Sequence, residues 1–146
     1  MKNPIASIAL WVNRGLAVIV VGLIFFLGGI LDWYCNFRML TEGDKTVITA
    51  CFYGCVLVIC AALWNVDRLL TNLLAGQVFT QANARRLRRI MWCCGGVSVL
   101  CLVATFAYLP LVFLVIIMAF LCLMVSVVAG VMDAAVAIRE ENDLTV

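Results

Sequence analysis

Eight cysteines are the most reactive side chains in this chain, and their spacing decides which redox or metal chemistry is available. Catalytic thiols and zinc sites usually pair cysteines as CxxC or combine them with histidine. The chain has no histidine, and Cys51 and Cys55 have CxxxC spacing. Most of the thiols fall in apolar stretches, where cysteine usually serves as a small hydrophobic side chain. We therefore expect no catalytic residue, no metal site, no cofactor and no enzymatic activity.

One pair of thiols remains a candidate for a disulfide. Cys35 follows the first apolar stretch and Cys51 lies about one turn inside the second, so both should lie near the same membrane face. Cys93 and Cys94 should lie at the opposite face, where the cytoplasm keeps thiols reduced. A disulfide between Cys35 and Cys51 is therefore a hypothesis.

Charge is the second source of chemistry, and it is concentrated in the segment 67–90, DRLLTNLLAGQVFTQANARRLRRI. The leucines of this segment recur with the spacing of an amphipathic helix at a membrane interface. Gly76 is placed to end that helix, and Thr80, with Phe79 before it, is placed to cap a new helix that begins near Gln81. Four arginines then cover most of the circumference of the new helix: Arg85, Arg86, Arg88 and Arg89.

Two interpretations of this segment stay open. The arginines could anchor the chain at anionic lipid headgroups, each contributing about 1 kcal/mol near the membrane surface. Alternatively, the segment is a docking platform for a cytoplasmic partner, because its polar residues Asn72, Gln77, Gln81 and Asn83 are not needed for anchoring. Direct binding of nucleic acid is not expected, since lipid phosphates would compete for the arginines.

The chain ends in REENDLTV, which places acidic side chains beyond the last apolar stretch. This segment is either a frayed polar tail or a surface whose carboxylates pair with the arginines or meet a partner. The expected partner-binding residues are thus Phe79, Asn83, Arg85, Arg86, Arg88, Arg89, Glu140, Glu141, Asn142, Asp143 and Leu144.

The elements that position these residues follow from hydropathy. Hydrophobic residues make up 66% of the 146 residues and charged residues only 12%, which a soluble domain of this size cannot bury. Runs without charge cover 15–31, 46–66 and 91–132, and the last is long enough for two spans with a turn at Tyr108-Leu109-Pro110. We predict a single all-α domain (1–146), an integral membrane four-helix bundle. Its spans are expected at about 12–34, 46–66, 89–109 and 111–135, with a cytoplasmic loop at 67–90 and a tail at 136–146.

Lysine and arginine predict the orientation of these spans. If both termini are cytoplasmic, eight basic residues lie inside and two outside, as the positive-inside rule requires. The first apolar segment is then a retained span rather than a cleaved signal peptide. The sequence therefore predicts a multi-pass plasma-membrane protein with both termini in the cytoplasm.

Ionisable residues in or beside the spans lie only near the span ends. The absence of a carboxylate at mid-membrane argues against a proton-coupled exporter. Arg14, Asp67, Arg89 and Asp133 should all lie near the inner surface, and we predict at least one ion pair between helices among them.

Small residues predict where one helix approaches another closely. Ser126, Gly130 and Ala134 recur at four-residue spacing in the last span. We expect this row to pack inside the bundle, and a contact between two copies of the chain is the alternative.

Two motifs resemble a known family. The loop GQVFTQANARRLRRI (76–90) and the terminal REENDLTV (139–146), together with the four spans, are similar to a bacterial inner-membrane family of unknown function. Members of that family are often encoded beside a small Cro-type helix-turn-helix protein. The resemblance implies a membrane partner for a cytoplasmic transcription regulator and implies no catalytic residue.

The sequence therefore favours a non-enzymatic inner-membrane protein that binds or sequesters a small helix-turn-helix regulator. Two alternatives stay open: a small transporter, channel or lipid-handling protein, and an assembly subunit of a larger membrane complex. A transporter would need a polar path, for which the spans offer few groups: Asn13, Asn65, Thr105 and Ser126.

Overall fold

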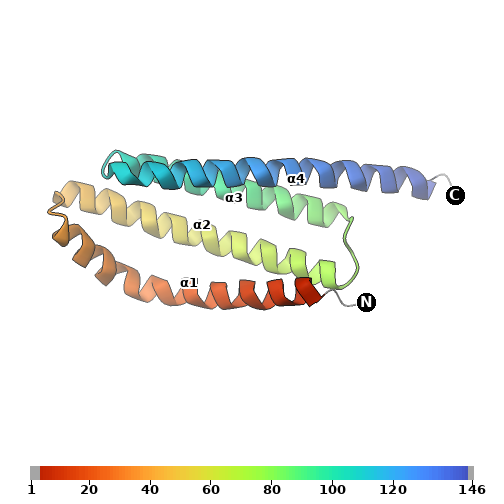
Figure 1. Cartoon of the computed structure of the whole chain (residues 1–146), viewed down its shortest axis with the longest axis horizontal. Coiled ribbons are helices and arrows are strands. Elements are labelled where there is room, and N and C mark those ends of the chain that lie inside the picture. Colours follow the sequence, from red (N-terminus) through yellow and green to blue (C-terminus); the bar gives the residue numbers. More distant parts are fainter. Residues whose placement is uncertain (1–3, 145–146) are drawn as a thin grey trace.

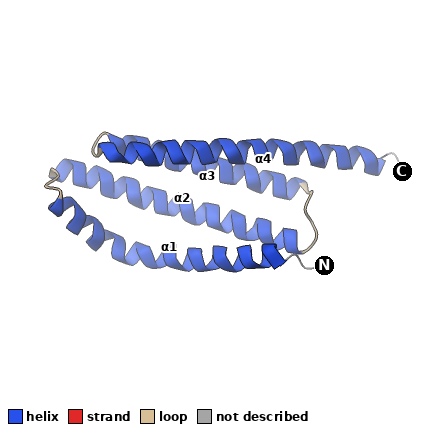
Figure 2. Ribbon diagram, in the orientation of Figure 1, coloured by secondary structure: helices blue, strands red, loops and turns tan. Residues whose placement is uncertain are grey.

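The computed structural model describes residues 4–144, with side chains for 4–142, and in this part of the chain it is all-α. Its helices are α1 (Pro4–Phe37), α2 (Glu42–Leu74), α3 (Gln81–Thr105) and α4 (Val112–Leu144), with a short 3-10 helix, η1 (Leu109–Leu111), before α4 (Figures 1 and 2). Four helical segments, α1, α2, α3 and η1 with α4, are long and apolar enough to cross a membrane. The prediction of an all-α chain with four such helices is therefore confirmed.

The helices run up and down, so each end of the molecule has a distinct composition. The start of α1, the α2–α3 connection and the end of α4 lie together, and we call this the terminal end (Figure 1). The α1–α2 and α3–α4 connections lie at the other end, which we call the hairpin end. At the terminal end α4 projects beyond the other helices.

Local sequence signals explain how α2 ends and α3 begins. Gly76 has a positive φ of 78°, and the backbone N–H of Gly76 and Gln77 donate to carbonyls in the last turn of α2. Thr80 is extended, and its hydroxyl accepts a hydrogen bond from the N–H of Asn83. The predicted helix stop and N-cap are therefore confirmed, and the connection between α2 and α3 is limited to residues 75–80.

The α3–α4 turn lies slightly earlier than predicted. Helix α3 ends at Thr105, the chain turns over 106–108, and Pro110 lies inside η1. A proline has no N–H to donate, which costs nothing in the first turn of a helix. Pro110 therefore lies in the first turn of the next helical segment instead of closing the connection.

The helices pack in chain order. Contacts join α1 to α2, α2 to α3 and α3 to α4, while α1 and α4 make no backbone contact within the described residues. Gly54 of α2 lets Leu100 of α3 approach closely, and Gly95 of α3 faces the sulfur of Cys122. The result is an open arrangement in which α1 and α4 form two unjoined edges.

The small-residue row of α4 points away from the other helices, so the expectation that it packs inside the bundle is wrong. Ser126, Gly130 and Ala134 are all exposed, and a side chain at Gly130 would meet nothing within 4 Å. The contact with α3 is made one residue earlier in the helical register. There Ala129 is buried with Leu87 and Ile90, among others.

The cysteines are structural in this fold. Cys35 and Cys51 are both buried and both free, so the hypothesised disulfide is not formed. Cys55 and Cys101 also lie inside the packed helices, in one cluster with Val97. The thiols therefore act here as small apolar side chains.

Candidate partner interface at the terminal end

Asn83 organises the connection between α2 and α3. Its side chain is completely buried, and its amide nitrogen donates to the carbonyls of Gln77 (2.6 Å) and Val78 (3.0 Å). Its side-chain oxygen accepts a hydrogen bond from the amide of Asn72 on α2 (2.8 Å). One side chain thus fixes the loop, the start of α3 and the end of α2 relative to one another.

The burial of Asn83 corrects one of the predicted partner contacts. A side chain with no exposed surface cannot touch a partner, so Asn83 supports the interface from behind. The sequence placed it at the surface because polar residues in a charged loop are mostly solvent-exposed. Here the bending loop leaves backbone carbonyls without helical partners, and a buried amide satisfies them.

Two of the four arginines contact other parts of the protein, and the other two do not form ion pairs among the described residues. Arg88 forms an ion pair with Asp133 of α4 (2.6 Å), and Arg86 donates to the backbone carbonyl of Arg68 (3.2 Å). Arg85 and Arg89 are exposed and form no ion pair within the described part of the chain. They lie one turn apart on α3 and therefore present two positive charges on one helix face.

The prediction of at least one ion pair between helices among Arg14, Asp67, Arg89 and Asp133 is confirmed. Arg14 of α1 and Asp67 of α2 do form an ion pair between helices, with 3.0 Å between Nε and Oδ1. Asp133 pairs with Arg88 and not with Arg14 or Arg89. Arg88 and Arg89 differ by about 100° around the helix axis, and only Arg88 is turned toward α4. Both pairs are partly exposed and contribute little to stability.

The end of α4 is joined to the loop. Arg139 donates to the carbonyl of Phe79 (3.4 Å), and Gln81 donates to the carboxylate of Glu140 (2.9 Å). Glu141 and Asn142 continue the helix at its exposed surface. The side chains of Asp143 and Leu144, which the sequence also placed at the interface, lie outside the described residues.

Two hollows with mixed polar and apolar linings flank the contact between loop and tail. One, of about 490 Å³, is lined in part by Phe79 and Arg139, and the other, of about 200 Å³, in part by Arg85. They share Gln81 and Glu140, so the hydrogen bond between these side chains lies between the hollows. Phe79 is 47% exposed beside them. The surface thus combines an aromatic ring, cations and carboxylates, which is a composition suited to binding a protein.

Polar side chains elsewhere in the helices bind nearby backbone. Asn13 donates to the carbonyl of Leu63, Asn65 to that of Ala61, and Thr105 to that of Cys101. Each of these groups is satisfied separately, so these three residues do not form a common polar path.

The sequence did not reveal a cluster at the hairpin end. The Tyr34 hydroxyl donates to the Tyr108 hydroxyl (2.8 Å), and the Arg38 guanidinium lies 5.9 Å from the centre of each ring. Nearby, Lys45 of α2 pairs with Asp32 of α1 (3.2 Å). These contacts tie the end of α1 to α2 and to the α3–α4 turn. Only the interfacial preference of tyrosine could have suggested them.

Comparison with known proteins gives a family and no function. The family model for a protein of unknown function, DUF2975, matches residues 3–146. No curated protein and no solved structure matches the chain.

In the described residues, no group of three or more histidine, cysteine, aspartate or glutamate side chains could hold a metal ion.

Proposed function

Since the chain belongs to the DUF2975 family, whose function is unknown, we propose a function from its own residues. We propose that it is a multi-pass protein of a bacterial inner membrane, with both termini in the cytoplasm. In this proposal the terminal end binds a small helix-turn-helix transcription regulator and holds it at the membrane, and the protein has no catalytic activity.

Exposed tryptophans support the membrane placement. Trp11, Trp64 and Trp92 each lie three or four residues from an arginine of the terminal end. Trp33 is exposed near the hairpin end, 22 residues after Trp11 on the same helix. At 1.5 Å per residue these two rings are about 33 Å apart, close to the thickness of the hydrocarbon core. Tryptophan prefers the two membrane interfaces, so this spacing fits a chain that crosses the bilayer.

The distribution of basic residues supports the orientation. The terminal end carries seven described arginines, whereas the hairpin end carries Arg38 and Lys45. An excess of arginine marks the cytoplasmic side of a multi-pass protein. The seven arginines are Arg14, Arg68, Arg85, Arg86, Arg88, Arg89 and Arg139.

The observation that carries the binding proposal is the fixed surface at the terminal end, where Arg85 and Arg89 have no ion pair among the described residues. A loop that only anchors the chain to lipid needs no buried amide to define its shape, yet Asn83 holds this one through three side-chain hydrogen bonds. On this rigid support, Arg85, Arg89 and Phe79 remain exposed. A preformed surface loses little conformational entropy when a partner binds. The choice of partner rests on the resemblance to a family that is often encoded beside such a regulator.

Site-specific crosslinking in the native host tests this proposal. A photoreactive phenylalanine analogue at Phe79 should crosslink a helix-turn-helix protein, identified by peptide mass spectrometry. The same analogue at Met39, a 92% exposed loop residue at the hairpin end, is the matched control. Adding R85E and R89E should abolish the Phe79 product without changing membrane level. A product that contains no DNA-binding protein, or the same product from both positions, would contradict the proposal.

A further inference from the structure

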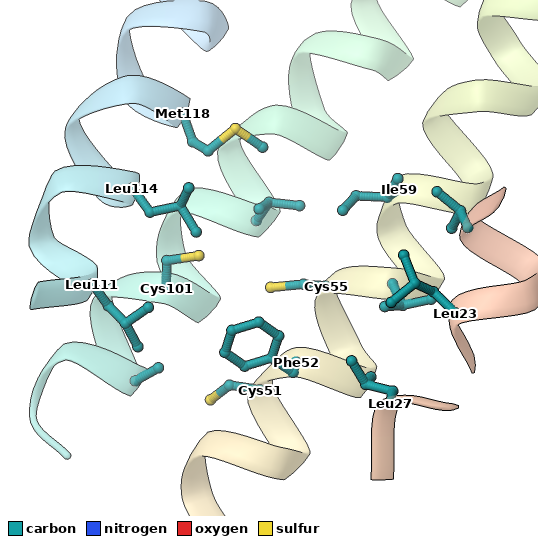
Figure 3. A pocket seen from close by; sticks show the side chains of 14 residues that line it. Leu23, Leu27, Cys51, Phe52, Cys55, Ile59, Cys101, Leu111, Leu114 and Met118 are labelled. Carbon is teal, nitrogen blue, oxygen red and sulfur yellow. The ribbon is translucent and has the colours of Figure 1, made fainter. Parts of the chain in front are cut away.

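A wholly apolar cavity of about 290 Å³ lies between the four helices, in the half nearer the hairpin end (Figure 3). Leu27 of α1, Phe52 of α2, Ala104 of α3 and Leu114 of α4 are among its lining residues. Leu27 lies ten residues before the end of α1, or about 15 Å along the helix axis. The cavity is therefore well inside the apolar part of the helices.

The lining contains no charge and no hydroxyl or amide side chain. The most polar side chains are thiols, with Cys55 and Cys101 pointing toward each other from α2 and α3 (Figure 3). Water needs two to four polar partners to be stable in a cavity, and an engineered apolar cavity of about 150 Å³ stays dry and accepts benzene. This cavity is nearly twice that size, so it suits an apolar occupant.

The open edge between α1 and α4 gives such an occupant a route. Both helices line the cavity, yet they make no backbone contact with each other within the described residues. Leu23 of α1 and Leu114 of α4 line the cavity from these two helices, and both are apolar and about 40% exposed. A molecule moving from the hydrocarbon core of the bilayer therefore meets no charge on its way into the cavity.

From these features we infer that the cavity is a binding site for one hydrocarbon chain of a bilayer lipid. The absence of polar lining excludes recognition of a headgroup there, so the site selects an acyl or prenyl chain by shape. This inference rests on the membrane insertion proposed above and is independent of the regulator. The lipid's hydrocarbon chain then fills the space between α1 and α4, which do not contact each other within the described residues.

Native mass spectrometry of the full chain in detergent micelles tests the inference. After delipidation and addition of a phosphatidylglycerol with oleoyl chains, the wild type should retain one lipid at collision energies that remove surface lipid. L114W fills the cavity from α4 and should lose that lipid. L123W makes the same substitution on the exposed surface of α4 and should retain it. Circular dichroism checks that both variants fold.

A second measurement keeps the test independent of folding in L114W. In a variant whose only thiol is Cys101, alkylation by a maleimide should slow when the phospholipid is added, saturating near one lipid per chain. A variant whose only thiol is Cys93, outside the cavity, should react at an unchanged rate. Equal protection of both thiols would overturn the inference, as would no retained lipid in the wild type. A third result would also overturn the inference: the wild type forms a lipid-free dimer, and L114W dissociates that dimer. The cavity would then be a contact with a second copy of the protein.

Discussion

Replacing Asn83 with alanine should destabilise the protein more than removal of any other amide side chain described above. The substitution removes three hydrogen bonds: one accepted from Asn72 and two donated to loop carbonyls. At about 1 kcal/mol for each bond, the expected loss in the free energy of unfolding is about 3 kcal/mol. The three partners, at Asn72, Gln77 and Val78, are not fully buried and can bind water instead, so the loss should not greatly exceed this value.

Thermal unfolding in detergent micelles, followed by circular dichroism, measures this loss. For a chain of this size, 1 kcal/mol corresponds to about 2–4 °C in Tm, so N83A should lower Tm by about 6–12 °C. N72A removes only one of the three bonds and should lower Tm by about a third as much. N83D keeps an acceptor but loses both donors, so it should be at least as destabilising as N83A.

Asn65 provides the matched control for this series, because its amide donates only to a carbonyl one turn earlier in its own helix. N65A should change Tm by less than about 2 °C, since that carbonyl also accepts within the helix. If N83A and N65A unfold within 2 °C of each other, the loop is not held by Asn83. The argument for a rigid interface would then fail.

Three further predictions concern single contacts. G76A should lower the free energy of unfolding by about 1–2 kcal/mol, as measured by chemical denaturation. Nothing would block the added Cβ, but an alanine backbone is strained at a φ of 78°. Y108F should cost about 1 kcal/mol by removing the hydrogen bond to Tyr34 at the hairpin end, as a lower Tm would show. R88Q should cost less than about 1 kcal/mol, because its ion pair with Asp133 is partly exposed, and 0.5 M salt should reduce the difference in Tm from wild type.

Each of these has a clear contrary result. A stable G76A would mean that the chain leaves α2 by another backbone path. A Y108F variant as stable as wild type would show that the tyrosine pair does not fasten the hairpin end. An R88Q variant that loses several kcal/mol would place this ion pair in a far less solvated setting than its exposure indicates.

Local chemistry explains which parts of the fold the sequence could predict. Gly76 and Thr80 act through their own backbone and nearest neighbours, so the end of α2 and the start of α3 were predictable from sequence. The number of apolar helices followed from run length in the same way. The choice of packing face on α4 was not predictable, because small residues occur on adjacent faces, at Ala129 and Gly130, and only the position of α3 distinguishes them.

The candidate interface shows the same limit. The segment that carries it was evident from the concentration of arginines, but the role of each residue depends on helical phase and on the partner helix. Arg88, not Arg89, meets Asp133, and Asn83 turns inward although four arginines follow it within residues 85–89. The apolar cavity had no sequence signal, because its lining residues are the same types that face the bilayer elsewhere.

Direct binding of the regulator to the terminal end is the central claim, and crosslinking from Phe79 tests it most directly. The account predicts that the analogue at Phe79 captures a helix-turn-helix protein, that the analogue at Met39 does not, and that R85E with R89E removes the product. Equal capture from both positions, or no DNA-binding protein in the Phe79 product, would contradict it.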